Sequence, residues 1–216
     1  MDDLFDEFTQ AERYVETEKY NHGIEIKAKA LIRKTNRIET RRAKSEQVLF
    51  DLLPQRLEKD TSYHVISHGD VDALSYLIHI MKTQPLDNLI LSTWCMAMPD
   101  LVWLRQQCDA FRIGNIDFVL GEIFPSQYPD EYEECQRMEQ DELCTLKIAR
   151  NHAKVMAGCH LESGFYFAIE SSSNVNTNPR IEQTAIHISK DLHDHYAEFF
   201  AGVKSIDGNR YKKTKP

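Results

Sequence analysis

The sequence predicts an α/β fold with a mixed, mostly parallel sheet flanked by helices and a helical extension at the N-terminus. Three observations support this fold class. A chain of 216 residues with 42% hydrophobic residues is long enough for one sizeable core. After Lys59, short apolar stretches alternate with segments of helical periodicity. Before Lys59, the spacing of the apolar residues is helical alone.

Residues 1–60 form the predicted helical extension. Between Ile24 and Lys59 there is no glycine, and Pro54 is the only proline. Apolar residues recur there at roughly helical intervals, so we expect one or two helices. Basic side chains gather in the same stretch, at Lys27, Lys29, Arg33, Lys34, Arg37, Arg41, Arg42 and Lys44. We interpret this run as a solvated helix face, with a contact to nucleic acid or to a protein partner as the alternative.

The main α/β domain is placed at residues 61–204. Residues 63–67 have the composition of a first strand. Residues 72–82 carry their apolar side chains on one helical face, and this helix must end before Pro85. Residues 88–94 (NLILSTW) hardly alternate between apolar and polar, which predicts a strand buried on both faces.

Three further elements are expected in the middle of the domain. Residues 99–111 read as a helix with a proline near its start, where a missing amide proton costs little. Residues 116–123 (IDFVLGEI) predict a third strand. Residues 129–140 predict a polar helix that contains part of an acidic run.

The C-terminal third of the chain completes the predicted domain. Residues 146–157 and 165–170 are expected to be two more strands, joined by a short connection that contains glycine. Residues 191–202 predict a last helix. Residues 205–216 form a basic tail that we expect to be flexible.

Composition narrows the classes of protein. The acidic start MDDLFDEF does not resemble a secretory signal, and no run approaches the ~18 apolar residues of a membrane span, so we expect a cytoplasmic protein with no membrane partner. The five cysteines include no C-x-x-C pair, and neither a metal nor a cofactor is expected. A net charge of -8 argues against a protein that coats nucleic acid, although local basic patches can still bind phosphate.

Polar residues follow several of the predicted strands. Asp70 and Asp72 come just after the first strand, where they either cap the next helix or line a ligand site. Trp94 and Glu122 end the second and third strands. Ligands of α/β folds bind at the carboxyl ends of strands, so these side chains are candidates for the wall of a cleft, with simple packing as the alternative.

The residues most informative about chemistry are His152 and Lys154. Side chains two residues apart on a strand face the same side, so on the predicted strand 146–157 the imidazole and the ammonium project together. A cation neutralises phosphate oxygens and favours the neutral, nucleophilic form of a neighbouring histidine. This pair could therefore attract a phosphate and attack it.

A second group of polar residues follows the strand at 165–170. Ser172, Ser173 and Asn174 leave the end of this strand, where hydroxyl, amide and backbone N–H groups can converge on an anion. Arg150 and Arg180 flank the motif segment and have forked donors that suit phosphate, although each could equally pair with a carboxylate.

His-x-Lys followed some twenty residues later by Ser-x-Asn resembles the phospholipase D-like (HKD) superfamily, specifically the small single-motif nucleases of phages and mobile elements. The resemblance covers residues 63–202, and the specific part runs from His152 to Glu182. It implies that His152 is a nucleophile that forms a phosphohistidine. Lys154 and Asn174 would hold the phosphate, Ser172 would support it, and Glu182 would orient the histidine.

Two positions depart from the pattern of the superfamily. Its aspartate, five residues after the lysine, is Cys159 here, and the glycine before its serine is Ser171. The aspartate is ascribed a supporting role, and Glu162 or Glu170 could replace it.

The resemblance also implies a second histidine that protonates the leaving oxygen. No other histidine in the chain is followed by lysine at the same spacing, and no internal repeat is visible. We therefore expect a homodimer in which each subunit donates one His152 to a shared site. Lys154, Asn174 and the serines would supply the charge stabilisation that a metal supplies in other phosphodiesterases, so no metal should be required.

Together these features predict a metal-independent phosphodiesterase, a nuclease acting on DNA as a homodimer. The preference for nucleic acid rests on the basic stretches and on the lack of an amphipathic segment for docking on a bilayer. Two alternatives stay open: a phospholipid hydrolase or phosphatidyltransferase, and a catalytically degenerate module that binds DNA or protein.

Overall fold

The computed structural model describes residues 37–176 and 180–206. The chain divides into two compact units, Met1–Thr40 and Arg41–Pro216, and the fold described here is that of the second unit. Most of the predicted extension at residues 1–60 and most of the basic tail at 205–216 lie outside the described residues. No described helix has the length and apolar character needed to cross a membrane.

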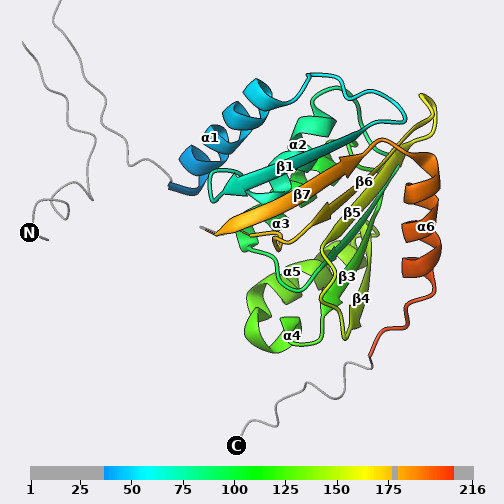
Figure 1. Ribbon diagram of the computed structural model, residues 1–216. Coiled ribbons are helices and arrows are strands. Elements are labelled where there is room, and N and C mark those ends of the chain that lie inside the picture. Colours follow the sequence, from blue (N-terminus) through cyan, green and yellow to red (C-terminus); the bar gives the residue numbers. More distant parts are fainter. Residues whose placement is uncertain (1–36, 177–179, 207–216) are drawn as a thin grey trace, which may run out of the picture. The chain divides into compact units, whose positions relative to one another are not determined.

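A seven-stranded mixed sheet forms the centre of the second unit (Figure 1). Its spatial order is β1-β7-β6-β5-β2-β3-β4. The strands are β1 (Ser62–His68), β2 (Asn88–Thr93), β3 (Ile116–Gly121), β4 (Cys144–Ala149), β5 (Val155–His160), β6 (Phe165–Ser171) and β7 (Ile181–His187). The α/β class is therefore confirmed, together with a mixed sheet flanked by helices.

The prediction of a mostly parallel sheet was wrong. Only the β2–β3 and β3–β4 pairs are parallel, while β1–β7, β7–β6, β6–β5 and β5–β2 are antiparallel. The reason lies in the connections. A helix links β2 to β3 and another precedes β4, whereas β5 and β6 are joined by a tight turn in which Gly164 has a φ of 63°. Such a turn permits an antiparallel hairpin only, because a parallel crossover needs about a dozen residues.

The predicted strand 146–157 was also wrong, because it is two strands. β4 lies at one edge of the sheet, and β5 lies between β6 and β2, so the chain must leave the sheet and cross the ends of β3 and β2 to reach its new place. Residues 150–154 make that crossing. Two elements were not predicted: β7, whose residues had been treated only as part of the motif segment, and the short helix α4 (Phe124–Gln127).

The predicted helices of the main domain are present, each within two residues of its expected ends. They are α2 (Ala73–Met81), α3 (Met98–Asp109), α5 (Pro129–Gln140) and α6 (Lys190–Ala201), and α1 (Arg37–Leu52) precedes them. Asp72 caps α2 by accepting a hydrogen bond from the backbone N–H of Ser75 at 2.9 Å. The capping interpretation of Asp72 is thereby confirmed.

The two faces of the sheet are covered unequally. On one face α2, α3 and α5 bury a core around Leu77, Phe118 and Phe167. On the other face α6 packs through Phe200 over the central strands, where Val119 lies in the same small cluster (Figure 1). The exposed ends of β1 and β7 carry Ile66 and Ile181, which are 79% and 66% exposed. The sheet is thus fully sandwiched only in its centre.

Arg42, from the basic run of α1, lies inside the protein. Its guanidinium donates a hydrogen bond to Asp100 and lies 3.7 Å from the Asp72 carboxylate, and all three side chains are nearly buried. Ser45 donates to the carbonyl of Asp70 at 2.9 Å, which ties the same helix to the loop after β1. Neither interpretation offered for the basic run applies to Arg42, because this side chain neutralises buried carboxylates.

Candidate active site

His152, Lys154 and the turn at residues 172–174 lie along one strand-end edge of the sheet, the side on which strands begin or end. β2 and β6 end at this edge, and β5 and β7, which run in the opposite direction, begin there. The segment between β4 and β5 also passes along it. Residues that are eighty positions apart in the sequence therefore become neighbours. The carboxyl ends of the parallel strands β2, β3 and β4 also lie here, and α/β folds bind ligands outside the carboxyl ends of their strands.

Asn151 fixes the segment that carries the histidine. Its side-chain amide donates to the carbonyl of Val119 at 2.8 Å and to the Ser92 hydroxyl at 3.0 Å, and its oxygen accepts from the N–H of Ala153 at 3.0 Å. The residue is buried. One amide thus joins the crossing segment to β2 and β3. Sequence reasoning missed this role, because Asn151 lies between Arg150 and His152 and has nothing in its local sequence that marks it as buried.

Replacing Asn151 by leucine should loosen this segment. Leucine has a similar shape but leaves the buried carbonyl of Val119 without its donor, and such a loss costs about 1–3 kcal/mol. A shift of about 1 Å in His152 would then lower its reactivity by up to ~100-fold. Urea denaturation and a cleavage assay measure the two effects. Asn115→Leu is the matched control: Asn115 lies at the opposite edge, and its amide contacts are at least 3.3 Å long. Equal effects of the two substitutions would contradict this positioning role.

His152 and Lys154 are in contact. The Lys154 Nζ lies 2.9 Å from Nδ1 and 3.2 Å from Nε2 of the imidazole, and it donates to the His152 carbonyl at 2.8 Å. The expected pairing of the two side chains is made by a loop, since neither residue belongs to a strand. A ring nitrogen that accepts from an ammonium carries a lone pair, and this is the form that a nucleophile needs. Burial lowers the pKa of Lys154, and the charge of Glu182 opposes that shift.

Trp94 forms the wall behind the histidine. The ring centroids of Trp94 and His152 are 5.8 Å apart. The indole can lie there because Gly121, at the end of β3, has no side chain: a Cβ at that position would come within 2.5 Å of the Trp94 ring. His152 itself is exposed, so the imidazole lies on an aromatic surface with its other side open to a ligand.

Asn174 is held with its oxygen turned inward. The side-chain oxygen accepts from the N–H of Trp94 at 3.3 Å and from the Thr93 hydroxyl at 3.4 Å. The backbone N–H of Trp94 can only donate, so the group facing it must be the amide oxygen, while the Thr93 hydroxyl directs its proton mainly to the carbonyl of Cys95 at 2.8 Å. The orientation of the amide is therefore determined, and its NH₂ group is the end that can meet an anion.

Ser172 and Glu182 form the next pair along the edge. The Ser172 hydroxyl donates to the Glu182 carboxylate and accepts from the N–H of Gln183 at 3.0 Å. The serine thereby joins the end of β6 to the start of β7. The negative charge of Glu182 partly offsets the lowering of the Lys154 pKa that burial causes.

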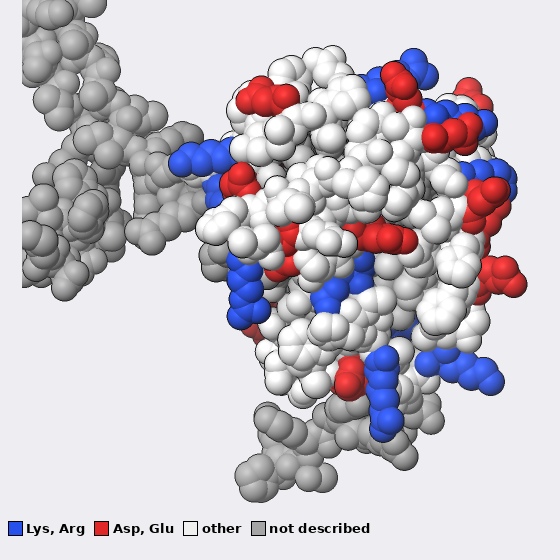
Figure 2. Space-filling view, viewed as in Figure 1, with Lys and Arg blue, Asp and Glu red and all other residues white. Residues whose placement is uncertain are grey.

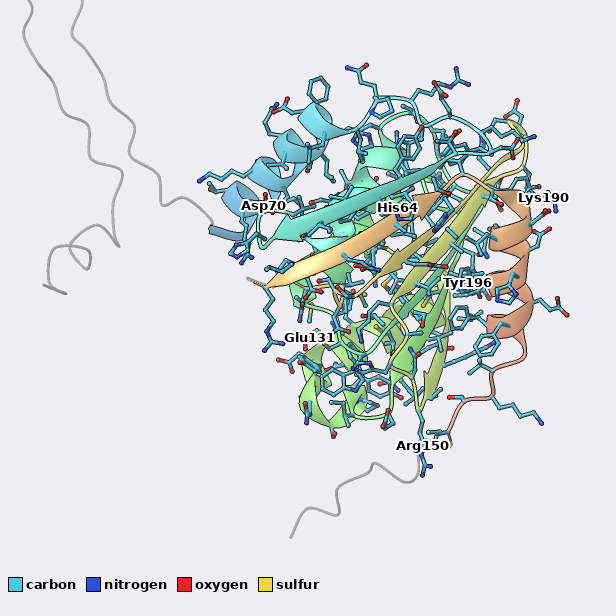
Figure 3. The ribbon with its side chains drawn as sticks, in the orientation of Figure 1. His64, Asp70, Glu131, Arg150, Lys190 and Tyr196 are labelled. Carbon is cyan, nitrogen blue, oxygen red and sulfur yellow. The ribbon has the colours of Figure 1, made fainter. Side chains whose placement is uncertain are left out.

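Not every predicted site residue faces this group. Ser173 is buried, and its hydroxyl donates to the carbonyl of Asn174 at 3.2 Å, so it holds the turn together. Arg150 and Arg180 are exposed. Arg150 extends away from the strands at the end of β4 (Figure 3).

Two positions differ from the superfamily pattern. Cys159 lies far from the histidine, and Ser171 lies at the end of β6. Cys159 is buried near the far end of β5, where it pairs with Asn88, so roughly 15 Å of strand separates it from Lys154. Ser171 is the last residue of β6, and its hydroxyl donates to the carbonyl of Gln183 in β7 at 3.3 Å.

Neither glutamate suggested as a replacement for the aspartate reaches the histidine. Glu162 lies in the turn after β5, at the opposite edge of the sheet. Glu170 accepts a hydrogen bond from Tyr196 of α6, and is therefore turned toward that helix. Within the described parts of the chain, no group of three or more potential metal ligands is gathered.

Comparison with known proteins gives matches among solved structures and none among protein families or curated sequences. No protein-family model and no curated protein sequence matches the chain. Among solved structures, polyphosphate kinase from Porphyromonas gingivalis superposes with a TM-score of 0.49 at 13% identity, covering 64% of this chain and 25% of the kinase chain. TrmBL2, an archaeal chromatin protein with a novel mode of DNA binding, superposes with a TM-score of 0.49 at 9% identity, covering 76% of this chain and 60% of that one. The chain thus spans less than two thirds of either structure.

Proposed function

We propose that this protein is a metal-independent phosphodiesterase of the phospholipase D-like type, with His152 as its nucleophile and DNA as its substrate. The supporting observation is the contact of 2.9 Å between the Lys154 ammonium and the His152 ring, at an edge where Asn174 and Glu182 are also held. An ammonium beside an imidazole binds phosphate oxygens and leaves a nitrogen lone pair close to the phosphorus.

The reaction would proceed in two displacements. An incoming phosphodiester would draw the Lys154 ammonium onto its oxygens, with the Asn174 amide as a second donor, and so free the ring nitrogen of His152. That nitrogen would form a bond to phosphorus while the bond to the leaving oxygen breaks, and an acid would protonate that oxygen. Water would then attack the phosphohistidine, releasing the phosphate monoester and restoring the imidazole.

The acid should come from a second subunit. Of the described histidines, only His68 shares this edge with His152, and three strand spacings, about 14 Å, separate β1 from β5. A proton cannot pass directly over that distance. We therefore propose a homodimer in which the partner's His152 protonates the leaving oxygen.

The dimer can be tested with mixed subunits. Wild-type chain and His152→Asn chain are refolded together in equal amounts, so that the subunits combine at random. If each turnover needs two copies of His152, activity should fall to about a quarter of the wild-type value, whereas independent sites would retain about half. Wild-type chain refolded with the variant His195→Asn, which alters an exposed histidine of α6, is the control and should keep full activity.

Loss of the superfamily aspartate need not abolish this chemistry. Cys159 lies near the far end of β5 and can contact neither the histidine nor a phosphate bound to Lys154. The position is therefore better interpreted as part of the packing of the sheet than as a catalytic one. This favours an intact site over a catalytically degenerate binding module.

Nucleic acid is the substrate class we favour, because exposed Arg150 and Arg180 flank the motif and can neutralise neighbouring phosphates. On the face shown in Figure 2, lysine and arginine side chains are scattered among acidic ones. We therefore expect DNA to contact a small area around the site and not an extended basic surface.

The substrate test compares DNA with lipid. Supercoiled plasmid, single-stranded DNA and phosphatidylcholine vesicles are each incubated with the protein in excess EDTA. We expect nicking or cleavage of DNA that the chelator does not reduce, and no release of choline. Choline release without any DNA cleavage would replace this proposal with a phospholipase.

We place the phospholipase D-like domain at residues 61–204, between the helical extension and the basic tail.

A further inference from the structure

A cavity of about 910 Å³ lies at the edge of the sheet opposite His152. The segment after α1, the turn between β5 and β6, and the beginning of α6 surround it. Lys190, on its rim, and Arg150, beside the candidate active site, are at opposite ends of the sheet (Figure 3). The volume is within the range of about 300–1,000 Å³ that is usual for small-molecule sites.

The wall of this cavity carries more positive than negative charge. Arg56, Lys59 and Lys190 line it, and Glu58 is the only carboxylate among the lining residues. Within the described part of the chain, neither Arg56 nor Lys59 forms a salt bridge, and both are exposed. Lys190 is already paired with Asp194. Two cations are thus available for an anion, and phosphate is the anion that arginine and lysine most readily hold together.

Two aromatic residues also line the cavity, Phe165 and Tyr166, the first two residues of β6. Their side chains point to opposite faces of the sheet, as those of successive strand residues do. Tyr166 is already in contact with the Lys190 ammonium, 5.0 Å from the ring centre, and with His193 of α6, so Phe165 is the ring that a base can meet. Polar groups lie nearby: the Ser163 hydroxyl is 2.8 Å from Nδ1 of His160 and donates to the side-chain oxygen of Gln84 at 3.4 Å. An aromatic ring, hydrogen-bonding groups and cations together suit a ligand that joins a base to a phosphate.

We propose that this cavity binds a nucleoside phosphate, with the base against Phe165 and the phosphate held by Arg56 and Lys59. The ligand is either a free nucleotide or one nucleotide unit of a nucleic-acid strand. The site is independent of the proposed cleavage reaction, because the whole length of β5 separates His160 from Lys154.

Calorimetric titration of the full chain with AMP tests the proposal, with adenosine and ribose 5-phosphate as the two halves of the ligand. Because stacking and charge each contribute roughly tenfold or more to affinity, we expect each half to bind at least ~10-fold more weakly than AMP. The double substitution Arg56→Ser and Lys59→Ser should weaken AMP binding by a similar factor. Lys44→Ser, an exposed change on α1, is the matched control.

The source of the ligand is assigned by a further titration with an eight-residue oligothymidylate, made with the wild-type chain and with the double variant. Binding tighter than that of AMP that is lost in the double variant would assign the cavity to a strand, and oligothymidylate binding that the double substitution leaves unchanged would assign it to a free nucleotide. Absence of AMP binding, or AMP binding that survives the double substitution, would overturn the proposal. The variant His152→Asn should bind AMP normally, so a failure of the cleavage mechanism is distinguishable from a failure of this one.

Discussion

His152→Asn should reduce EDTA-resistant DNA cleavage by at least ~1,000-fold, because the substitution removes the nitrogen that attacks phosphorus. Asparagine is close in size to histidine, and His152 is exposed, so the free energy of unfolding should change by less than ~0.5 kcal/mol. The initial rate of plasmid nicking and urea denaturation measure the two quantities.

Two further variants make this result specific. Lys154→Met keeps the nucleophile but removes the cation beside it, and we expect a similarly large loss of activity. His195→Asn changes a histidine on the exposed side of α6 and should retain full activity. Cleavage that persists in His152→Asn, or that depends equally on His195, would show that a different group performs the chemistry.

Arg42→Met should destabilise the fold by about 3–5 kcal/mol, although Arg42 belongs to a basic run that suggests a surface. The substitution leaves the Asp72 carboxylate at the start of α2 and the Asp100 carboxylate in the first turn of α3 buried without their common cation. Lys44→Met, on the exposed side of the same helix, is the control and should change the free energy of unfolding by less than ~0.5 kcal/mol.

The cost of Arg42→Met should also depend on pH. Burial raises the pKa of Asp100 to about 6, and Asp72 adds to that shift while Arg42 opposes it. A carboxyl group whose pKa is raised on folding binds its proton more tightly in the folded state, so this group contributes more stability as pH falls from about 6 toward its ordinary value of about 4. Without Arg42 the effect grows, and the penalty should be smaller at pH 5 than at pH 7.5. A penalty that is the same at both pH values would contradict this assignment.

Local patterns predicted the parts of the fold that depend on local rules. The helix at α5 matches its predicted ends, and Asp72 caps α2 as a short acidic side chain before an apolar run should. The near-continuous apolar run of β2 correctly indicated a strand buried on both faces. In each case the neighbours in the sequence are also the neighbours that decide the structure.

The errors arose where distant segments decide the structure. Periodicity cannot reveal that β5 inserts between β6 and β2, and this insertion breaks the predicted strand 146–157 and makes most of the sheet antiparallel. Asn151 takes its positioning role only because Ser92 and Val119 come to lie beside it. Similarly, the charge of Arg42 predicted a position on the surface, whereas the fold brings Asp72 and Asp100 next to it and so allows the side chain to be buried.

The covalent intermediate is the most direct test of the proposed chemistry. The protein is mixed with a short DNA substrate in EDTA, quenched under denaturing alkaline conditions within the first turnover, digested, and analysed by mass spectrometry. We expect a nucleotide phosphate attached to the peptide that contains His152, lost in acid and absent from His152→Asn. Full cleavage of the DNA with no adduct on His152, or an adduct on a different residue, would contradict the account.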